Sequence, residues 1–224
     1  MKLNTYIDHT QLKAIATPKD IIKLCDEAKE YDFFAVCVNT CHVKLAANEL
    51  KDCDVKVAAV VGFPLGANSS QVKIYEAHSG IKEGASEIDM VLNVGWLKAK
   101  RYALVEEEIA VIKKTIGEHT LKVILETCYL SDDEIRMACQ IAKRAGADFV
   151  KTSTGFGTAG TTAHHVKIMH EEVGDTLKIK ASGGIRDTQT AVKYINLGVS
   201  RIGTSSGIDI VTSANKKNTD EYTY

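Results

Sequence analysis

The sequence predicts an α/β protein built as a single-domain (β/α)8 barrel, the TIM-barrel class. Short runs rich in β-branched and other apolar residues alternate with longer amphipathic stretches along all 224 residues. This alternation is typical of strand–helix units repeated around a parallel sheet, and eight such units can be counted. A chain of this length is enough for one closed barrel, although length alone also allows two small domains. No Pro- or Ser-rich linker divides the chain, which favours one domain.

Each expected strand is a short apolar run bounded by turn-forming or polar residues. The eight runs are residues 5–8, 33–38, 55–62, 87–93, 121–126, 148–152, 177–182 and 201–203. The barrel domain is predicted to cover residues 1–213. The polar segment 214–224 is predicted to be a mobile C-terminal tail. Because it ends in Tyr222-Thr223-Tyr224, folding of these tyrosines over the barrel mouth is the alternative.

Capping residues predict where several helices begin and end. Thr17-Pro18-Lys19-Asp20 combines a cap, a first-turn proline and an acid at the positive end of a helix. Asn68-Ser69-Ser70-Gln71 and Ser131-Asp132-Asp133-Glu134 both resemble capping boxes. Six glycines are predicted to end helices in the αL conformation, namely Gly80, Gly84, Gly117, Gly146, Gly174 and Gly198.

Composition argues against several classes of partner and site. The net charge is −1 and charged residues make up 25% of the chain, which argues against charge-driven binding to nucleic acid or to a membrane surface. The absence of a signal-peptide pattern and of an apolar run of about 18 residues predicts a cytoplasmic protein. Six cysteines without C-x-x-C spacing predict reduced thiols. Cys41-His42 has no matching Cys/His pair, so no structural zinc is expected.

Three charged residues in the expected strands are predicted to point into the barrel. In the run 87–93 the even-numbered positions are apolar, which turns Asp89 toward the opposite face. The same alternation turns Lys151 and Lys180 inward if the apolar face of each strand packs on the helices. Both lysines lie late in their strands, and the strand ends of a parallel barrel meet at one mouth. The two lysines are therefore expected to share a site.

A buried ion cluster that only stabilises the barrel is one interpretation of these charges. However, one carboxylate and two ammonium groups leave a positive charge unpaired, an arrangement that contributes little to stability. An amine must be neutral to attack a carbonyl, and a free lysine with a pKa near 10.4 is neutral about one time in a thousand at about pH 7.4. A nearby ammonium group and partial desolvation can lower the pKa of an amine by about 3 pH units, or roughly 4 kcal/mol. The pattern therefore favours a lysine that forms a Schiff base.

Loops rich in glycine and hydroxyl groups follow the last three expected strands, at residues 154–160, 182–184 and 203–207. In barrels of this class the loops after strands seven and eight, with the N-terminus of a short helix, often bind phosphate. Ser205-Ser206-Gly207-Ile208-Asp209 is predicted to begin such a helix. A single Gly-rich loop is more often a turn, but the order of these three favours a phosphate site.

With these residues located, the sequence resembles the deoxyribose-phosphate aldolases, a family of class I aldolases. The resemblance spans nearly the whole chain through Tyr6-Ile7-Asp8-His9-Thr10-Gln11-Leu12-Lys13, Val36-Cys37-Val38-Asn39, Val61-Gly62-Phe63-Pro64-Leu65-Gly66, Glu87-Ile88-Asp89-Met90-Val91, Glu126-Thr127, Phe149-Val150-Lys151-Thr152-Ser153-Thr154-Gly155 and Lys180-Ala181-Ser182-Gly183-Gly184-Ile185-Arg186. It implies a (β/α)8 barrel that reversibly splits 2-deoxy-D-ribose 5-phosphate into acetaldehyde and D-glyceraldehyde 3-phosphate. It also implies a place in deoxynucleoside catabolism, with no metal and no other cofactor.

The resemblance further implies roles for individual residues. Lys151 matches the Schiff-base residue, Lys180 the lysine that keeps it neutral, and Asp89 the proton donor and acceptor paired with Lys180. Asp8, Thr10 and Cys37 would line the mouth without reacting. The residues expected to bind substrate and phosphate are Thr10, Cys37, Thr152, Gly155, Gly183, Gly184, Ser205 and Ser206.

Some features depart from the family pattern or stay open. Phe156 stands where some members have a lysine, so backbone dipoles are expected to supply most of the charge neutralisation for phosphate. Tyr222 or Tyr224 is the candidate for the C-terminal tyrosine that members can bring into the site. A transaldolase or another sugar-phosphate aldolase is one rival interpretation, and a non-catalytic sugar-phosphate-binding barrel is another. The oligomeric state stays open, with a homodimer as one expectation.

Overall fold

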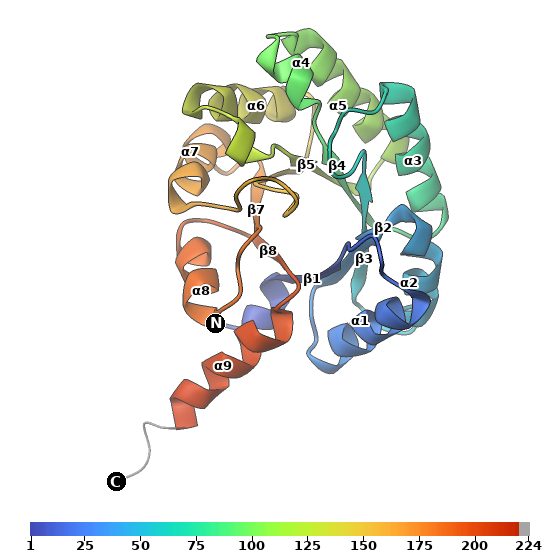
Figure 1. Cartoon of the computed structure of the whole chain (residues 1–224), viewed down its shortest axis with the longest axis vertical. Coiled ribbons are helices and arrows are strands. Elements are labelled where there is room, and N and C mark those ends of the chain that lie inside the picture. The colour runs from blue at the N-terminus through green and yellow to red at the C-terminus, as the bar shows by residue number, and fades with distance from the viewer. Residues whose placement is uncertain (220–224) are drawn as a thin grey trace.

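A computed structural model describes residues 1–219 and shows a closed barrel of eight parallel strands in chain order (Figure 1). Each strand pairs with the next, and β8 pairs with β1 to close the sheet. The predicted single-domain (β/α)8 barrel is thereby confirmed. The strands are β1 (Ile7–Gln11), β2 (Ala35–Asn39), β3 (Lys56–Val61), β4 (Glu87–Val91), β5 (Thr120–Ile124), β6 (Phe149–Lys151), β7 (Lys178–Ser182) and β8 (Arg201–Thr204).

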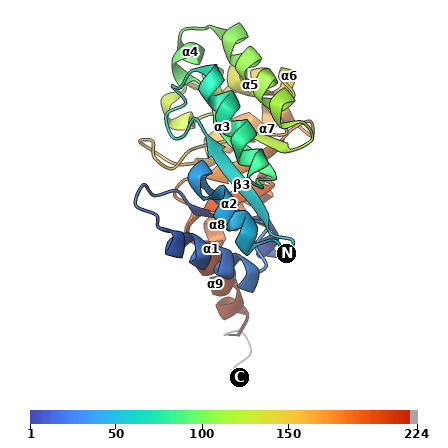
Figure 2. The same ribbon diagram turned by 90° about the vertical axis from the view of Figure 1, so that its right-hand side faces the viewer.

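The α-helices form a ring outside the barrel, and α9 extends away from it (Figures 1 and 2). They are α1 (Pro18–Glu30), α2 (Val43–Glu49), α3 (Ser70–Lys82), α4 (Val94–Lys98), α5 (Tyr102–Ile116), α6 (Asp132–Arg144), α7 (Ala163–Val173), α8 (Thr188–Asn196) and α9 (Gly207–Thr219), with 3-10 turns at Leu3–Tyr6, Thr40–His42 and Thr127–Tyr129. The main hydrophobic core brings together apolar residues of the strands and of this ring. A small second cluster consists of Leu12, Cys37, Ala58 and Val60. No helix in the described part of the chain is long and apolar enough to span a membrane.

Two of the three predicted helix starts are confirmed. Thr17 caps α1 in a reciprocal capping box with Asp20, and Ser131 caps α6 in the same way with Glu134. The box predicted at 68–71 is wrong, because the N-cap of α3 is Ser69 and its side chain makes no capping hydrogen bond. The neighbouring Ser70 hydroxyl instead donates to Glu108 of α5 at 2.9 Å.

Five of the six predicted glycine stops follow or end helices with positive φ, but Gly80 lies inside α3. A Cβ at Gly80 would lie 3.5 Å from the Ala59 side chain and 3.4 Å from Ile88. This glycine therefore allows α3 to pack closely on β3 and β4. Gly117 and Gly174 have ψ of −127° and −133°, so these two stops are not in the αL conformation that was expected.

Both ends of the chain differ from the prediction. The first strand begins at Ile7 and not at Thr5, because residues 3–6 form a 3-10 turn in which the Thr5 hydroxyl donates to the Lys2 carbonyl at 2.9 Å. At the other end the α9 backbone continues through Thr219, so residues 214–219 of the expected tail are helical. Tyr222 and Tyr224 lie outside the described residues.

Candidate active site

Seven charged side chains from six strands meet inside the barrel, and each is less than a tenth exposed. They are Asp8 of β1, Glu87 and Asp89 of β4, Lys122 of β5, Lys151 of β6, Lys180 of β7 and Arg201 of β8. Asp89, Lys151 and Lys180 thus point inward, as the strand alternation predicts. The group holds four cations and three carboxylates, so it carries one surplus positive charge when all seven are ionised.

Asp89 is the centre of this group. Its Oδ2 lies 2.9 Å from the Nζ of Lys151 and 2.8 Å from the Nζ of Lys180, while its Oδ1 lies 2.7 Å from the Nζ of Lys122. Burial alone would raise the pKa of Asp89, but the three ammonium groups outweigh burial and hold that pKa well below its ordinary value. Asp89 is therefore a carboxylate at neutral pH.

Lys180 is a permanent positive charge next to Lys151. Its Nζ lies 2.8 Å from Asp89 Oδ2 and 2.5 Å from Asp8 Oδ2, although the contact with Asp8 is an ion pair without hydrogen-bond alignment. Burial would lower the pKa of Lys180, but Asp8 and Asp89 raise it above its ordinary value. Lys151 and Lys180 are paired residues of neighbouring strands and share one oxygen of Asp89.

Asp8 couples this group to the pH dependence of stability. Burial would raise the pKa of Asp8, but Arg201, Lys180 and Lys122 lower it to about 2. Since the folded-state pKa is below the unfolded value of about 3.9, the stabilisation is present above about pH 4 and is lost as the pH falls toward about 2. We expect Asp8 to contribute about 2 kcal/mol to the free energy of unfolding across this window.

Denaturant unfolding of the wild type and of Asp8→Asn at a series of pH values measures this contribution. The difference in unfolding free energy between the two proteins is expected to shrink as the pH falls below about 4. A difference that stays constant down to the lowest pH at which both proteins fold would contradict the assignment to Asp8.

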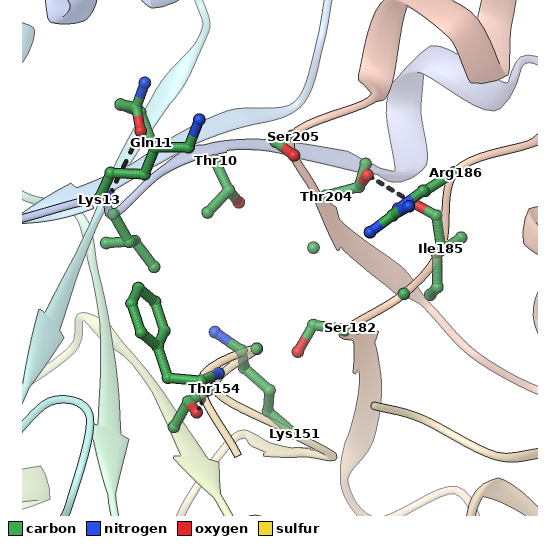
Figure 3. A pocket seen from close by; sticks show the side chains of 16 residues that line it. Thr10, Gln11, Lys13, Lys151, Thr154, Ser182, Ile185, Arg186, Thr204 and Ser205 are labelled. Carbon is green, nitrogen blue, oxygen red and sulfur yellow. Dashed lines mark hydrogen bonds between the residues drawn. The ribbon is translucent and has the colours of Figure 1, made fainter. Parts of the chain in front are cut away.

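A cavity of about 260 Å³ opens at the carboxyl ends of the strands, between the loops after β1, β6, β7 and β8 (Figure 3). It is lined by Thr10, Gln11, Leu12, Lys13, Lys151, Thr154, Gly155, Phe156, residues 182–186 and residues 203–205. Of the seven interior charges, all of which lie in the described part of the chain, Lys151 is the one that lines this cavity. Its amine is therefore the interior group that a ligand in the cavity can reach.

The structure brings five of the eight predicted binding residues to the cavity wall. These are Thr10, Gly155, Gly183, Gly184 and Ser205. Ser206 does not line the cavity, and its backbone N–H donates to the Thr204 hydroxyl at 2.9 Å just before α9. Within residues 1–219 no group of three or more His, Cys, Asp or Glu side chains is arranged to hold a metal ion.

Cys37 and Thr152, two more of the predicted binding residues, do not line the cavity. Cys37 is fully buried beside Leu12, and burial raises the pKa of its thiol. The Thr152 hydroxyl donates to the Ser182 carbonyl at 3.1 Å and accepts from the Ser182 N–H at 3.0 Å. It points away from Lys151 because adjacent strand residues face opposite sides, and it joins β6 to β7.

Two exposed cations at the cavity wall, Lys13 and Arg186, were not predicted as site residues. Figure 3 shows them on opposite sides of the cavity, Lys13 beside Gln11 and Arg186 beside Ile185. These two side chains add positive charge at the cavity wall to that of the backbone dipoles expected there. Each residue lies in the loop that follows a strand, two residues after the end of β1 for Lys13 and four after the end of β7 for Arg186. Both also belong to the motifs at 6–13 and 180–186, and this position is the signal that could have revealed them.

Glu126 positions the loop after β6, a role that was not predicted although Glu126-Thr127 is one of the motifs of the family resemblance. Its backbone has φ of 56°, which non-glycine residues seldom adopt. The carboxylate accepts from the N–H of Thr154 at 3.2 Å and from the Thr154 hydroxyl. That hydroxyl oxygen in turn accepts from the N–H of Phe156 at 3.0 Å. Glu126 therefore links the end of β5 to the cavity wall.

Comparison with known proteins shows the family of this chain. The family model described as DeoC/LacD family aldolase matches residues 3–213. The chain belongs to this family. The matched segment of this DeoC/LacD aldolase takes in all seven interior charges and every residue that lines the cavity.

Individual relatives of this DeoC/LacD aldolase cover nearly its whole length. Deoxyribose-phosphate aldolase of Natranaerobius thermophilus is 56% identical over 212 residues, which cover 94% of this chain and 96% of the relative. The solved structure of QR15, an aldolase, superposes with a TM-score of 0.93 at 43% identity, covering 97% of this chain and 98% of the other. The tetrameric deoxyribose phosphate aldolase of Aeropyrum pernix has a TM-score of 0.87 at 32% identity, covering 96% and 92%.

Proposed function

We propose that this DeoC/LacD aldolase is a class I deoxyribose-phosphate aldolase. It reversibly cleaves 2-deoxy-D-ribose 5-phosphate to acetaldehyde and D-glyceraldehyde 3-phosphate through a Schiff base on Lys151. The observation that carries this proposal is the cavity-facing amine of Lys151, which shares one oxygen of Asp89 with the amine of Lys180. The substrate follows from the relatives that are deoxyribose-phosphate aldolases.

The charge balance favours a neutral Lys151. Lys180 and Arg201 each contact two carboxylates, and these contacts raise the pKa of both cations. Lys151 contacts one carboxylate oxygen, which it shares, and it reaches the cavity. Loss of one proton from Lys151 removes the surplus positive charge of the interior, since four cations then become three. The neutral amine is the form that attacks an aldehyde.

The reaction follows from this nucleophile. The Nζ of Lys151 attacks C1 of the open-chain sugar, and loss of water from the carbinolamine gives a protonated imine. Removal of the proton from the C3 hydroxyl breaks the C2–C3 bond, and the electron pair moves into the imine to give an enamine. D-Glyceraldehyde 3-phosphate leaves at this step. Protonation of the enamine at C2 and addition of water then release acetaldehyde and restore Lys151.

Asp89 is proposed to transfer protons through a water molecule at the cavity floor, with Lys180 holding its carboxylate in place. Asp89→Asn removes this function but increases the positive surplus around Lys151, which favours the neutral amine. We therefore expect imine formation to persist while cleavage slows by about 10²-fold or more. Single-turnover cleavage and borohydride trapping of the imine measure the two steps separately. Equal loss of both steps, or loss of neither, would contradict this role.

The phosphate is proposed to bind at the side of the cavity formed by the loops after β6, β7 and β8. Gly155, Gly183 and Ser205 line that side, where the two glycines can present only backbone groups, and α9 begins two residues after Ser205 with its positive dipole end. Lys13 and Arg186 add side-chain charge at the wall. The phosphate would then lie at the far end of the sugar from the C1 that reacts with Lys151.

Product analysis tests the function. Incubation of the purified protein with 2-deoxy-D-ribose 5-phosphate is expected to release acetaldehyde and D-glyceraldehyde 3-phosphate in equal amounts. Transfer of a three-carbon ketol unit to an acceptor aldehyde would instead identify a transaldolase. Binding of the sugar phosphate without turnover would support a non-catalytic barrel.

A further inference from the structure

Lys122 is a buried charged side chain that contacts Asp89 and Glu87 without reaching the cavity. It is fully buried on β5, and it does not line the cavity. Its Nζ lies 2.7 Å from Asp89 Oδ1 and 2.5 Å from Glu87 Oε2, and 5.8 Å from the centre of the Phe149 ring. Burial of a lysine ammonium is costly unless the ammonium is paired and hydrogen-bonded, and even then the pair adds little to stability.

The contact with Lys122 determines which oxygen of Asp89 the other two lysines bind. Because Lys122 occupies Oδ1, both Lys151 and Lys180 are left to bind the single oxygen Oδ2. Without Lys122, Oδ1 would be a buried acceptor without a partner. The carboxylate could then turn and present one oxygen to each of the two remaining lysines, which would give Lys151 an ion pair of its own and stabilise its protonated form.

We propose that Lys122 is a positioning residue for the Schiff-base reaction. Lys122 holds Oδ1 of Asp89, so Lys151 and Lys180 compete for Oδ2, and this competition favours release of the proton from Lys151. This inference rests on the proposed function.

Lys122 is also one of the four cations that together give the interior its surplus positive charge. Its partner Glu87 does not neutralise it alone, because Arg201 also donates to Glu87, at 3.2 Å and 3.1 Å. The titratable groups that face this interior are Asp8 of β1, Cys37 of β2, Glu87 and Asp89 of β4, Lys151 of β6, Lys180 of β7 and Arg201 of β8, while β3 contributes Ala58 and Val60. Removal of Lys122 makes the charges of this set equal, so less is gained when Lys151 loses its proton.

Lys73 offers a matched control outside the barrel. It too is fully buried, and its Nζ lies 2.8 Å from Glu108 Oε2 and 2.9 Å from the Val91 carbonyl. This ion pair joins α3 to α5. Lys73→Met therefore removes a buried lysine with one carboxylate partner but leaves the interior group intact.

The test is the pH profile of kcat/KM for cleavage of 2-deoxy-D-ribose 5-phosphate by the wild type, Lys122→Met, Lys122→Arg and Lys73→Met. At about pH 7, Lys122→Met is expected to have a kcat/KM about 10-fold or more below that of the wild type, and its kcat/KM is expected to recover as the pH rises. The pH at which kcat/KM reaches half of its maximum is expected to lie about one pH unit higher than in the wild type. Lys122→Arg is expected to return the half-maximal point toward the wild-type pH because it restores the charge. Lys73→Met is expected to keep the wild-type half-maximal point, with its plateau reduced only by any unfolded fraction.

Glu87→Gln tests the same inference in the opposite direction, and it replaces Lys122→Met in the experiment if Lys122→Met does not fold. It removes a carboxylate and raises the positive surplus, so its half-maximal point is expected to move to lower pH. The positioning role would be overturned if Lys122→Met had a lower maximal kcat/KM but reached half of that maximum at the same pH as the wild type. Where Glu87→Gln is used in its place, an unshifted half-maximal pH of that variant would have the same meaning. If the wild type itself neither cleaves the sugar phosphate nor is trapped by borohydride, the proposed function fails, and the inference about Lys122 fails with it.

Discussion

Replacement of Lys151 by methionine is expected to abolish cleavage of 2-deoxy-D-ribose 5-phosphate, with a loss in kcat/KM on the order of 10⁵-fold or more. Methionine nearly matches the length of the lysine side chain but has no amine, so no imine can form. Lys151 is the interior group that lines the cavity, and no other interior amine can replace it there. A coupled assay of D-glyceraldehyde 3-phosphate release measures the effect.

Lys178→Met is the matched control for this variant. Lys178 lies on β7, is exposed, and has its Nζ 5.8 Å from the centre of the Phe149 ring. Lys178 takes part in none of the ion pairs of the seven interior charges, so its replacement removes one lysine from the barrel sheet and leaves those pairs intact. We expect kcat/KM to stay within about 2-fold of the wild type, as is usual for an exposed position. Substantial turnover by a folded Lys151→Met protein would remove Lys151 from the mechanism.

Replacement of Lys180 by leucine is expected to lower kcat/KM by about 10³-fold or more. The interior then holds three cations and three carboxylates, and Asp89 Oδ2 is left to Lys151 alone. Lys151 therefore keeps its proton and cannot attack the aldehyde. Unlike Lys151→Met, this variant retains the nucleophile, so borohydride trapping is expected to be slow at about pH 7 and faster in more alkaline solution.

Stability has to be measured with this variant, because Asp8 and Asp89 each lose a buried partner. Breaking a buried pair costs about 3–5 kcal/mol, so part of the loss in activity could come from unfolding. Denaturant unfolding gives the folded fraction, by which the rate is corrected, and Lys178→Leu provides a control on the same strand. A corrected rate near that of the wild type would exclude Lys180 from the scheme.

Strand alternation accounts for the part of the site that could be predicted. It gives the direction of a side chain, so Asp89, Lys151 and Lys180 could be turned inward from their apolar neighbours. Lys122 follows the same rule between Leu121 and Val123, and its charge in an apolar strand was a signal that could have been used. The predicted surplus of one positive charge nevertheless matches the full group of four cations and three carboxylates.

Contacts between distant strands could not be predicted in this way. Arg201 and Asp8 are 193 residues apart, and barrel closure alone brings them together. The alternation of side chains along a strand also does not show how far below the cavity an inward-facing side chain lies. Cys37 is level with Thr10, yet Leu12 packs against Cys37 and the cavity does not reach it. Direction comes from local sequence, whereas distance and depth come from the closed barrel.

The central claim is that the amine of Lys151 becomes a nucleophile for aldehydes. Incubation of the wild type with acetaldehyde and borohydride, followed by peptide mass analysis, tests it most directly. The predicted result is one ethyl group on the peptide that contains Lys151, with no such group in Lys151→Met. An unmodified Lys151 peptide, or an ethyl group placed on another lysine at equal yield, would contradict the claim.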